Sequence, residues 1–224
     1  QRDAAKSIIE NNLYGLDIDN RAYQLSYFAV MMKARQYNRR ILNGENHPHV
    51  YAIQESNAIN RDQLQYFGAG MNEMQRNIAM LQIHGLLDTF IDAKEYGSIL
   101  DVDSYDWQLL HQFVDNIEIT GQLSFDTVGV EDTQFQVRLL VEIGAIMASK
   151  YDVVVTNPPY LGNGDMNARL DTYIQNNFAD VKTDLFAVFI VKCSKWIKHN
   201  RYLSMVTMQS WMTLGAFESL RKKI

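Results

Sequence analysis

Of all stretches in this sequence, the run Asn-Pro-Pro-Tyr at residues 157–160 best fits a chemical role, by its residue types and their spacing. It follows the apolar run YDVVVT, which we predict to be a strand, and it holds two of the three prolines in the chain. Because proline has no backbone N–H and cannot continue a strand ladder, we expect the strand to end at Thr156. The run then forms a stiff loop at the carboxyl end of a strand, where ligands bind in open α/β sheets.

This loop carries groups that could activate a planar amine, such as the exocyclic amine of a base. Such an amine is a poor nucleophile because its lone pair is delocalised into the ring. The side-chain oxygen of Asn157 and the carbonyl oxygen of Pro158 could accept its two N–H groups and so localise the lone pair towards an electrophile. Pro158 and Pro159 would hold this geometry before the substrate arrives, and Tyr160 could stack on the ring with a gain of about 1–3 kcal/mol. The alternative is a plain Asn-Pro turn after a buried strand.

Acidic residues follow two other predicted strands. The run NLYGLDID places Asp17 where an acid accepts hydrogen bonds from ribose hydroxyls in nucleotide-binding units, and Ile18 would then lie against an adenine face. Glu55 follows the run HVYAIQ at the same place on the next strand, where it could meet the exocyclic amine of a bound adenosine. Two alternatives stay open: Asp19 or Asn20 caps the following helix, with or without a binding role for Asp17, and Glu55 is merely solvated.

Helices and strands that alternate along the chain must position these residues. Apolar spacing predicts helices at 2–11, 20–42, 135–149, 183–197 and 214–224, and strands at 12–19, 50–54, 151–157 and 201–208. The predicted helix 20–42 is apolar at Leu25, Phe28, Ala29 and Met32. Thr183 is the expected N-cap of the predicted helix at 183–197. The strand–helix order predicts the α/β class with a mainly parallel sheet.

The section 57–133 is too long for an ordinary crossover between parallel strands, and we interpret it as a mainly helical insertion. Residues 57–98 are predicted to be mostly helical, and 101–133 to be a loop-rich, acidic section. The predicted apolar positions of the first part are Met74, Ile78, Leu81 and Leu86. The residues GAG at 68–70 lack the setting of a phosphate-binding loop and are expected to form a turn between helices.

The composition narrows the class of protein. The chain has 224 residues with 47% hydrophobic and 21% charged residues, which is typical of a soluble globular protein. A free-standing nucleic-acid binder usually has a basic face, and with a net charge of -5 none is visible here. Either the substrate is not nucleic acid, or the basic surface lies on another part of the protein. The sequence contains no apolar run of about 18 residues, so it predicts no membrane span. Cys193 is the single cysteine, which fits a cytoplasmic protein, and the spacing of the five histidines matches no metal site.

Taken together, the motifs resemble those of the amino-methyltransferases that use S-adenosylmethionine and carry N-P-P-Y. The closer likeness is to the adenine-specific DNA methyltransferases that act on the N6 amine and whose cofactor motifs precede N-P-P-Y. NLYGLDID resembles their second motif, YAIQES the third, with Glu55 in place of the usual Asp, and VVVTNPPY the fourth. TDLFAVFIVKCSKWI, RYLSMVTMQSWM and FESLRKKI resemble the fifth to seventh. YAIQESN and DAKEYGSIL are also similar to segments of the PglX-type methyltransferases of the BREX phage-defence systems.

The resemblance implies an incomplete Rossmann-like methyltransferase sheet with a helical insertion. Residues 1–56 would be its cofactor-side part, 57–133 the insertion and 134–224 the catalytic part. Asn157, Pro158, Pro159 and Tyr160 are the implied catalytic residues, and Asp17, Ile18, Glu55 and Asn157 the implied binding residues for S-adenosylmethionine. No metal is implied.

The chain starts without Met at QRDAAK and stops within a predicted helix, so we expect it to be part of a longer protein. The family's Gly-rich first motif would precede Gln1, and its recognition domain and later stacking aromatic would lie elsewhere in that protein. The isolated piece is then expected to methylate weakly or not at all. The expected partners are double-stranded DNA, bound through the recognition domain with the adenine flipped out, and other defence-system subunits. The implied role is host-DNA modification in defence against phage, in the cytoplasm and away from membranes.

Two rival interpretations stay open. N-P-P-Y also serves methyltransferases that act on RNA bases or on a protein glutamine, although the long insertion and the motifs after Tyr160 favour DNA. Alternatively, the protein is a scaffold that has the methyltransferase fold and no activity, in which case it need not bind S-adenosylmethionine.

Overall fold

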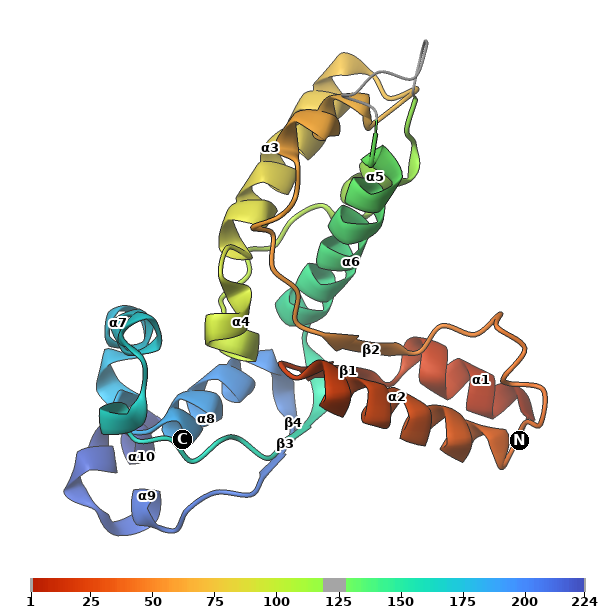
Figure 1. Ribbon diagram of the computed structural model, residues 1–224. Coiled ribbons are helices and arrows are strands. Elements are labelled where there is room, and N and C mark those ends of the chain that lie inside the picture. The colour runs from red at the N-terminus through yellow and green to blue at the C-terminus, as the bar shows by residue number, and fades with distance from the viewer. Residues whose placement is uncertain (1, 119–127, 224) are drawn as a thin grey trace. The chain divides into compact units, whose positions relative to one another are not determined.

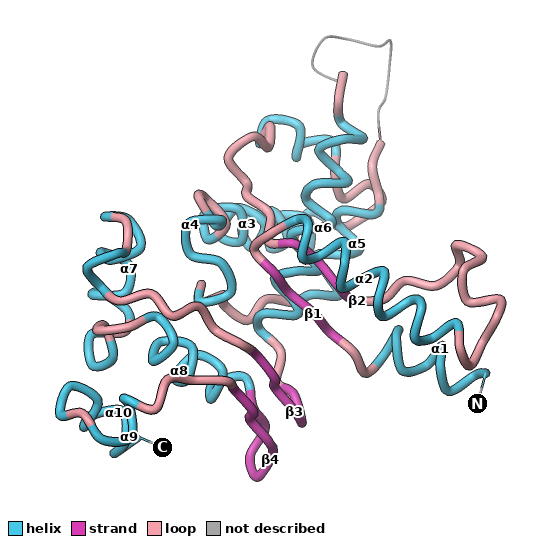
Figure 2. Tube along the Cα trace, turned by 60° about the horizontal axis from the view of Figure 1, so that its bottom comes forward, coloured by secondary structure: helices cyan, strands magenta, loops and turns pink. Residues whose placement is uncertain are grey.

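The computed structural model describes residues 2–118 and 128–223 and divides the chain into two compact units, Gln1–Ile146 and Met147–Ile224. Each unit contains one pair of short parallel strands together with helices (Figures 1 and 2). The predicted α/β class with parallel strands is therefore confirmed. No helix among the described residues is both long enough and apolar enough to cross a membrane.

The first unit begins with the expected strand–helix–strand arrangement. Its elements are α1 (Arg2–Asn11), β1 (Tyr14–Asp17), α2 (Asn20–Arg35) and β2 (His49–Ala52). The two strands pair in parallel, with Tyr14 beside His49 and Asp17 beside Ala52. Their carboxyl ends therefore lie at the same edge of this small sheet.

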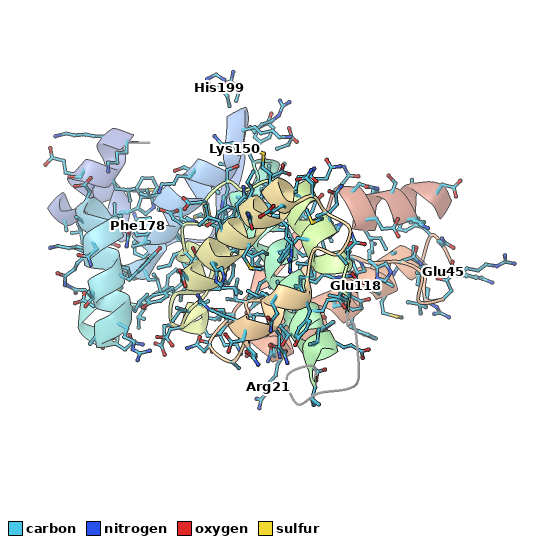
Figure 3. All side chains as sticks on the ribbon, turned by 90° about the horizontal axis from the view of Figure 1, so that it is seen from above. Arg21, Glu45, Glu118, Lys150, Phe178 and His199 are labelled. Carbon is cyan, nitrogen blue, oxygen red and sulfur yellow. The ribbon has the colours of Figure 1, made fainter. Side chains whose placement is uncertain are left out.

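A side-chain cap sets the start of α2. The Asp19 carboxylate accepts a hydrogen bond from the backbone N–H of Arg21 at 2.8 Å, which satisfies one of the unpaired donors of the first turn. The Arg21 side chain itself extends away from the helix (Figure 3). The interpretation of Asp19 as a helix cap is thus confirmed.

The predicted apolar face of α2 is wrong, and so is the predicted end of this helix. The helix ends at Arg35 instead of residue 42. Leu25 is 69% exposed, whereas Met31 and Ala34 are buried in a cluster with Ile9 of α1 and Ile41. Because α2 has apolar residues on two sides, its spacing alone could not tell which side meets α1.

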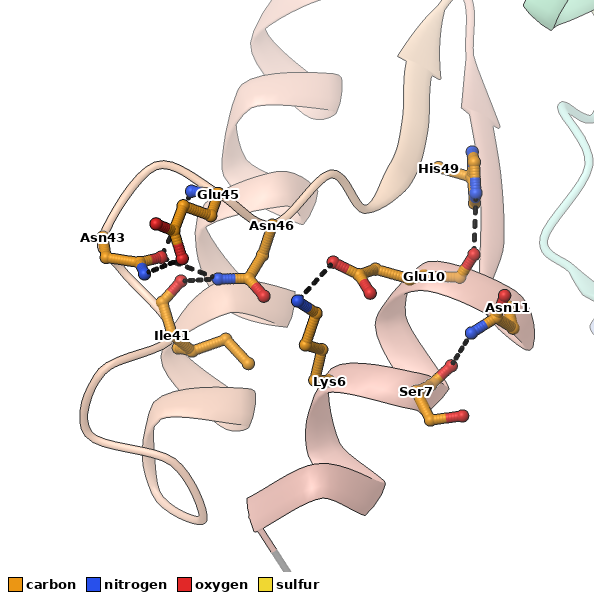
Figure 4. Close-up of polar contacts among 9 residues, drawn as sticks. All are labelled: Lys6, Ser7, Glu10, Asn11, Ile41, Asn43, Glu45, Asn46 and His49. Atoms are coloured by element: carbon orange, nitrogen blue, oxygen red, sulfur yellow. Dashed lines mark hydrogen bonds and ion pairs between the residues drawn. The ribbon is translucent and has the colours of Figure 1, made fainter.

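Polar contacts close the loop between α2 and β2 and join the start of β2 to α1 (Figure 4). The Asn46 amide donates to the carbonyl of Ile41 at 2.8 Å, which closes the loop. His49 Nε2 lies 2.8 Å from the carbonyl oxygen of Glu10 and must be the donor, since a carbonyl can only accept. The start of β2 is therefore held at the end of α1.

The remainder of the first unit is mainly helical. It comprises η1 (Arg61–Tyr66), α3 (Glu73–Thr89), α4 (Ala93–Tyr96), η2 (Gly97–Ile99), α5 (Trp107–Asp115) and α6 (Val130–Ala148), the last of which continues into the second unit. The turn at 68–70 separates η1 from α3, as predicted. The bounds 1–56, 57–133 and 134–224 of the predicted domains stay a prediction.

Two expectations for this helical part are wrong. The section 101–133 was expected to be loop-rich, but α5 lies within it, and Phe113 of α5 packs edge-on against Phe67 with the ring centroids 5.9 Å apart. Residues 119–127 of that section lie outside the described residues. In α3, Leu86 is buried as predicted, but Met74, Ile78 and Leu81 are exposed and Ile83 is buried instead. The buried side is the one that can meet α5.

The second unit is built around the parallel pair β3 (Tyr151–Thr156) and β4 (Ile197–Met205). Its helices are η4 (Asn163–Asp165), α7 (Ala168–Asn177), η5 (Ala179–Val181), α8 (Leu185–Trp196), α9 (Ser210–Thr213), η6 (Gly215–Phe217) and α10 (Glu218–Lys223). Thr156 pairs with Met205, so the residues that follow both strands lie at the same sheet edge. Lys150 and His199 lie at the opposite, amino-terminal end (Figure 3).

The cap of α8 differs from the prediction. Asp184, not Thr183, is the N-cap residue, and its carboxylate accepts from the backbone N–H of Phe186 at 3.2 Å. The helix begins one residue later than expected, so Thr183 lies one position too far from it. The carbonyl of Thr183 instead accepts from the N–H of Asn163 at 3.1 Å.

Candidate active site

The loop that follows β3 begins where the sequence predicts. The strand ends at Thr156, and no residue of 157–160 continues the ladder with β4. Pro158 is buried, whereas Asn157, Pro159 and Tyr160 are exposed. The loop is therefore anchored through one proline ring and presents the Asn157 side chain to solvent.

The Asn157 amide is not consumed by neighbouring main chain. Within the described part of the chain, its one polar side-chain contact lies between Oδ1 and the Tyr160 hydroxyl at 3.5 Å, and that hydroxyl donates its proton to Val206 instead. That distance is well beyond the usual 2.5–3.0 Å for a hydroxyl donor, so the contact is weak. Oδ1 is thus available to a stronger donor from a ligand.

The ring of Tyr160 has a defined position although 49% of the residue is exposed. Its hydroxyl donates to the backbone carbonyl of Val206 at 3.0 Å, just after β4. Its ring packs edge-on against the buried ring of Phe186, with centroids 6.3 Å apart and an interplanar angle of 75°. Phe186 in turn contacts Phe217 at 5.6 Å between centroids. The ring is therefore held at its edge and at its hydroxyl.

The chain beyond Tyr160 is bound to the start of α8. The N–H of Leu185 donates to the carbonyl of Leu161 at 2.9 Å, and Gly162 forms a β-bridge with Asp184. These contacts hold the second end of the loop, as β3 holds the first. Together they restrict how far the loop can move.

A second group of candidate residues lies in the first unit, at the carboxyl ends of β1 and β2. Oδ1 of the half-buried Asp17 accepts from the N–H of Asp19 at 2.9 Å, and Ile18 is 48% exposed. The ladder continues past the strands, because the N–H of Ile53 donates to the carbonyl of Asp17 at 2.8 Å. Glu55 follows two residues later. The structure therefore brings Asp17, Ile18 and Glu55 to one edge.

One oxygen of Glu55 has a fixed partner. Oε1 accepts from the backbone N–H of Lys94 at 3.1 Å, whereas Oε2 has no hydrogen-bond partner among the described residues. The carboxylate is thus oriented and keeps an acceptor for a ligand. Asn157 belongs to the second unit.

Phe186, Val206 and Lys94 are contributors that sequence reasoning missed. The run TDLF does place an aromatic residue just after the cap of α8, which is a usable signal for Phe186. Val206 and Lys94 act through their backbone carbonyl and N–H groups, which are common to all side-chain types. Their roles therefore leave no mark in residue type or spacing.

The described residues provide neither a metal site nor a reactive cysteine. In the portions of the chain that are described, no group of three or more His, Cys, Asp or Glu residues could hold a metal ion. Cys193 is buried in α8, and this burial raises the pKa of its thiol to about 12. At neutral pH it is a packed, protonated thiol and not a nucleophile.

Comparisons with known proteins agree with the motifs. The family model described as Eco57I restriction-modification methylase matches residues 11–224. The adenine-specific methyltransferase PglX of Lacticaseibacillus casei (strain Zhang) is 36% identical over 226 residues, which cover 100% of this chain and 18% of PglX. The adenine-specific methyltransferase BrxX of Escherichia coli O9:H4 (strain HS) is 33% identical over 239 residues, which cover 98% of this chain and 19% of BrxX.

A more distant relative covers less of the chain. The type II methyltransferase M.VspI of Vibrio sp. (strain 343) is 25% identical over 109 residues, which cover 47% of this chain. The chain thus spans less than a fifth of the length of PglX and BrxX, with 18% and 19% covered.

Proposed function

Because this chain belongs to the Eco57I restriction-modification methylase family, we propose that the full-length protein that carries it is an adenine-specific DNA methyltransferase. It transfers a methyl group from S-adenosylmethionine to the exocyclic amine of adenine. The observation that carries this proposal is the exposed Asn157 amide beside the buried Pro158, in a loop held at both ends. The names of PglX and BrxX, which describe adenine-specific methyltransferases, support the choice of base.

Asn157 and Pro158 activate the amine in this proposal. Asn157 Oδ1 and the Pro158 carbonyl oxygen each accept one N–H of the adenine amine. These two hydrogen bonds withdraw the lone pair from the ring and direct it towards the methyl donor. Because the prolines fix the backbone from which both oxygens project, little reorganisation of the loop is needed when the reaction occurs. No side chain has to act as a base, since the amine loses its proton after it has become cationic.

Tyr160 holds the ring of the adenine. A base within the duplex cannot reach a loop of this kind, so it must leave the stack. The aromatic ring of Tyr160 offers a stacking surface, and Val206 and Phe186 hold that ring in place. Stacking on Tyr160 contributes about 1–3 kcal/mol to binding of the flipped base.

The edge formed by Asp17, Ile18 and Glu55 fits the adenosine half of S-adenosylmethionine. Two carboxylates flank an exposed apolar side chain, which matches two ribose hydroxyls, an apolar ring and an exocyclic amine. Asp17 accepts from the ribose, Ile18 lies against the adenine face, and Oε2 of Glu55 accepts from its amine. When bound, the cofactor supplies a methyl carbon attached to a sulfonium sulfur, and this sulfur leaves as a neutral thioether with the electron pair of the broken C–S bond.

The architecture and setting that we infer follow from the same family. The two parallel strand pairs are consistent with parts of one Rossmann-like sheet, and 57–133 is the insertion between its cofactor-side and catalytic parts. The partner is double-stranded DNA, which a recognition domain elsewhere in the protein binds. The biological role is modification of host DNA in a phage-defence system, in the cytoplasm and with other subunits of that system.

Nucleoside analysis tests this function against its rivals. DNA and RNA from cells that express the full-length protein are digested, and methylated adenosine is quantified against cells that carry Asn157→Ala. We expect N6-methyladenine in DNA from wild-type cells alone. Methylation confined to RNA, or to glutamine in proteins of the same cells, would identify the rival enzyme class. An absence of methylation and of cofactor binding would identify a scaffold.

A further inference from the structure

We propose that the turn at residues 92–97, which lies within the helical insertion, forms one wall of the cofactor site and positions Ile18 and Glu55. This inference rests on the proposed function of the site. The turn comprises α4 and the first residue of η2, and η2 contacts β1. In Figure 1, α4 lies beside the carboxyl ends of β1 and β2.

The residues that follow β2 are fastened to the end of α3 and to the turn. The Ser56 N–H donates to the carbonyl of Phe90 at 3.0 Å, and its hydroxyl donates to the carbonyl of Leu87 at 2.5 Å. Ser56 is buried, so both of its polar groups need these partners. On one side of Ser56, Glu55 accepts from the backbone N–H of Lys94. The turn therefore sets the orientation of the Glu55 carboxylate.

A reciprocal pair holds the turn on the other side of Ser56. The Asn57 amide donates to an Asp92 carboxylate oxygen at 2.8 Å, and the Asp92 N–H donates to Asn57 Oδ1 at 2.9 Å. Asp92 has φ 52°, a left-handed conformation that is unfavourable for a residue other than glycine. Two hydrogen bonds to Asn57 offset part of that cost. The turn is thus held in one conformation beside Glu55.

Gly97 brings the turn against Ile18. Its φ is +61°, and a Cβ at this position would lie 3.2 Å from Ile18 Cδ1, closer than ordinary van der Waals contact. The far side of Ile18 stays open, because the residue is 48% exposed despite this contact. An adenine ring on the open side would therefore meet an Ile18 side chain that Gly97 supports from behind. This arrangement makes Gly97 a positioning residue.

Gly97→Ala in the full-length protein tests this role, and Gly70→Ala is its matched control. Gly70 also has a positive φ, +74°, and nothing lies within 4 Å of an added Cβ, so its variant places alanine at a positive φ without touching Ile18. A double variant adds Ile18→Val to Gly97→Ala. Valine lacks the Cδ1 atom of Ile18, which is the atom that the new Cβ at position 97 approaches. Asn57→Ala is an additional variant at an exposed position, and it releases the turn without any change at a glycine.

Calorimetric titration with S-adenosylmethionine and with S-adenosylhomocysteine supplies the readout. We expect Gly70→Ala to bind like wild type, and Gly97→Ala to bind roughly tenfold more weakly or worse because overpacking displaces Ile18. The added Ile18→Val removes the contact with the new Cβ and should recover part of that loss, a rescue that general destabilisation would not produce. Asn57→Ala should weaken binding by roughly threefold to tenfold.

The outcomes separate this inference from the function on which it rests. If wild type binds neither compound, the proposed function itself fails. If wild type binds while Gly97→Ala and Asn57→Ala bind equally well, the function stands and the wall formed by the turn is wrong. If Ile18→Val brings no recovery to a folded Gly97→Ala protein, the contact between Gly97 and Ile18 does not position the site.

Discussion

The hydroxyl of Tyr160 donates a hydrogen bond to the backbone carbonyl of Val206 at 3.0 Å, which joins the loop after β3 to the residue after β4. Parallel strands place their carboxyl ends together, and this bond uses that proximity to fix an aromatic ring at the edge of the sheet. The loop is thus braced by the neighbouring strand as well as by its own prolines.

Tyr160→Phe should separate anchoring of the ring from stacking. The variant keeps the ring and loses the bond to Val206, worth about 0.5–1.5 kcal/mol. We expect a threefold to tenfold weaker apparent affinity for DNA, roughly that energy converted to a ratio. Tyr160→Ala should lose the stacking of about 1–3 kcal/mol as well. Fluorescence of 2-aminopurine at the target base measures flipping, and equal signals from both variants would contradict the stacking role.

Phe186→Leu should loosen Tyr160 from behind. The substitution removes an edge-on ring contact with Tyr160, worth about 0.5–1.5 kcal/mol, and a tilted ring contact with Phe217. The matched control is Phe178→Leu, which removes a buried ring of the same unit that contacts Tyr173 instead. Both variants should lower the melting temperature, but only Phe186→Leu should reduce base flipping. A similar loss of flipping in both would mean that Phe186 acts through stability alone.

Asp17→Asn should weaken cofactor binding without affecting α2. Asparagine keeps the Oδ1 acceptor for the Asp19 N–H but loses the charge that favours ribose hydroxyls. The expected loss is about 1.5 kcal/mol or more, which is at least roughly tenfold in Kd. Asp19→Ala should show the opposite pattern, with faster hydrogen exchange in α2, a cap loss of about 1 kcal/mol, and unchanged affinity. If Asp17→Asn instead destabilised α2 while Asp19→Ala weakened cofactor binding, the assigned roles would be reversed.

The pairing of β3 with β4 should depend on pH through Asp152. Hydrogen bonds from Lys198 and then Arg201 hold the pKa of this exposed carboxyl below its ordinary value of 3.8. A lowered pKa in the folded state means that the stabilisation is fully present above the ordinary value and is lost as the pH falls through the folded value.

Hydrogen exchange of the β3 and β4 amides measures this effect. Wild type should be better protected than Asp152→Asn near neutral pH. The difference should disappear only at pH values below 3.8, where the wild-type carboxyl becomes protonated. A difference that persists unchanged through that range would exclude Asp152 as its source.

Local chemistry accounts for what the sequence predicted well. The diproline ends β3 at Thr156 because no ladder can pass through it, and Asp19 caps α2 because it directly precedes the first helical turn. Both outcomes depend on residues adjacent in the chain. Asp17, Ile18 and Glu55 met at one edge because parallel strands align their ends.

Contacts between distant segments account for what it missed. The exposed Leu25 of α2 lies on an apolar side that resembles the buried one, so spacing could not identify the partner. Lys94 reaches Glu55 across 39 residues through a backbone N–H, which no side-chain pattern reports. The proposed role of Gly97 depends on its positive φ and on the position of the Ile18 side chain beside it, and neither can be read from the sequence.

The most direct measurement is the single-turnover rate of methyl transfer to adenine by full-length Asn157→Ala with saturating S-adenosylmethionine and DNA. If Asn157 Oδ1 activates the amine, the rate should fall by roughly 10²-fold or more, the size of effect found when one preorganised polar group is removed from an active site. The melting temperature should stay close to that of wild type, because the Asn157 side chain is exposed and makes only a weak contact with Tyr160. A variant that transfers methyl groups at the wild-type rate would contradict the account.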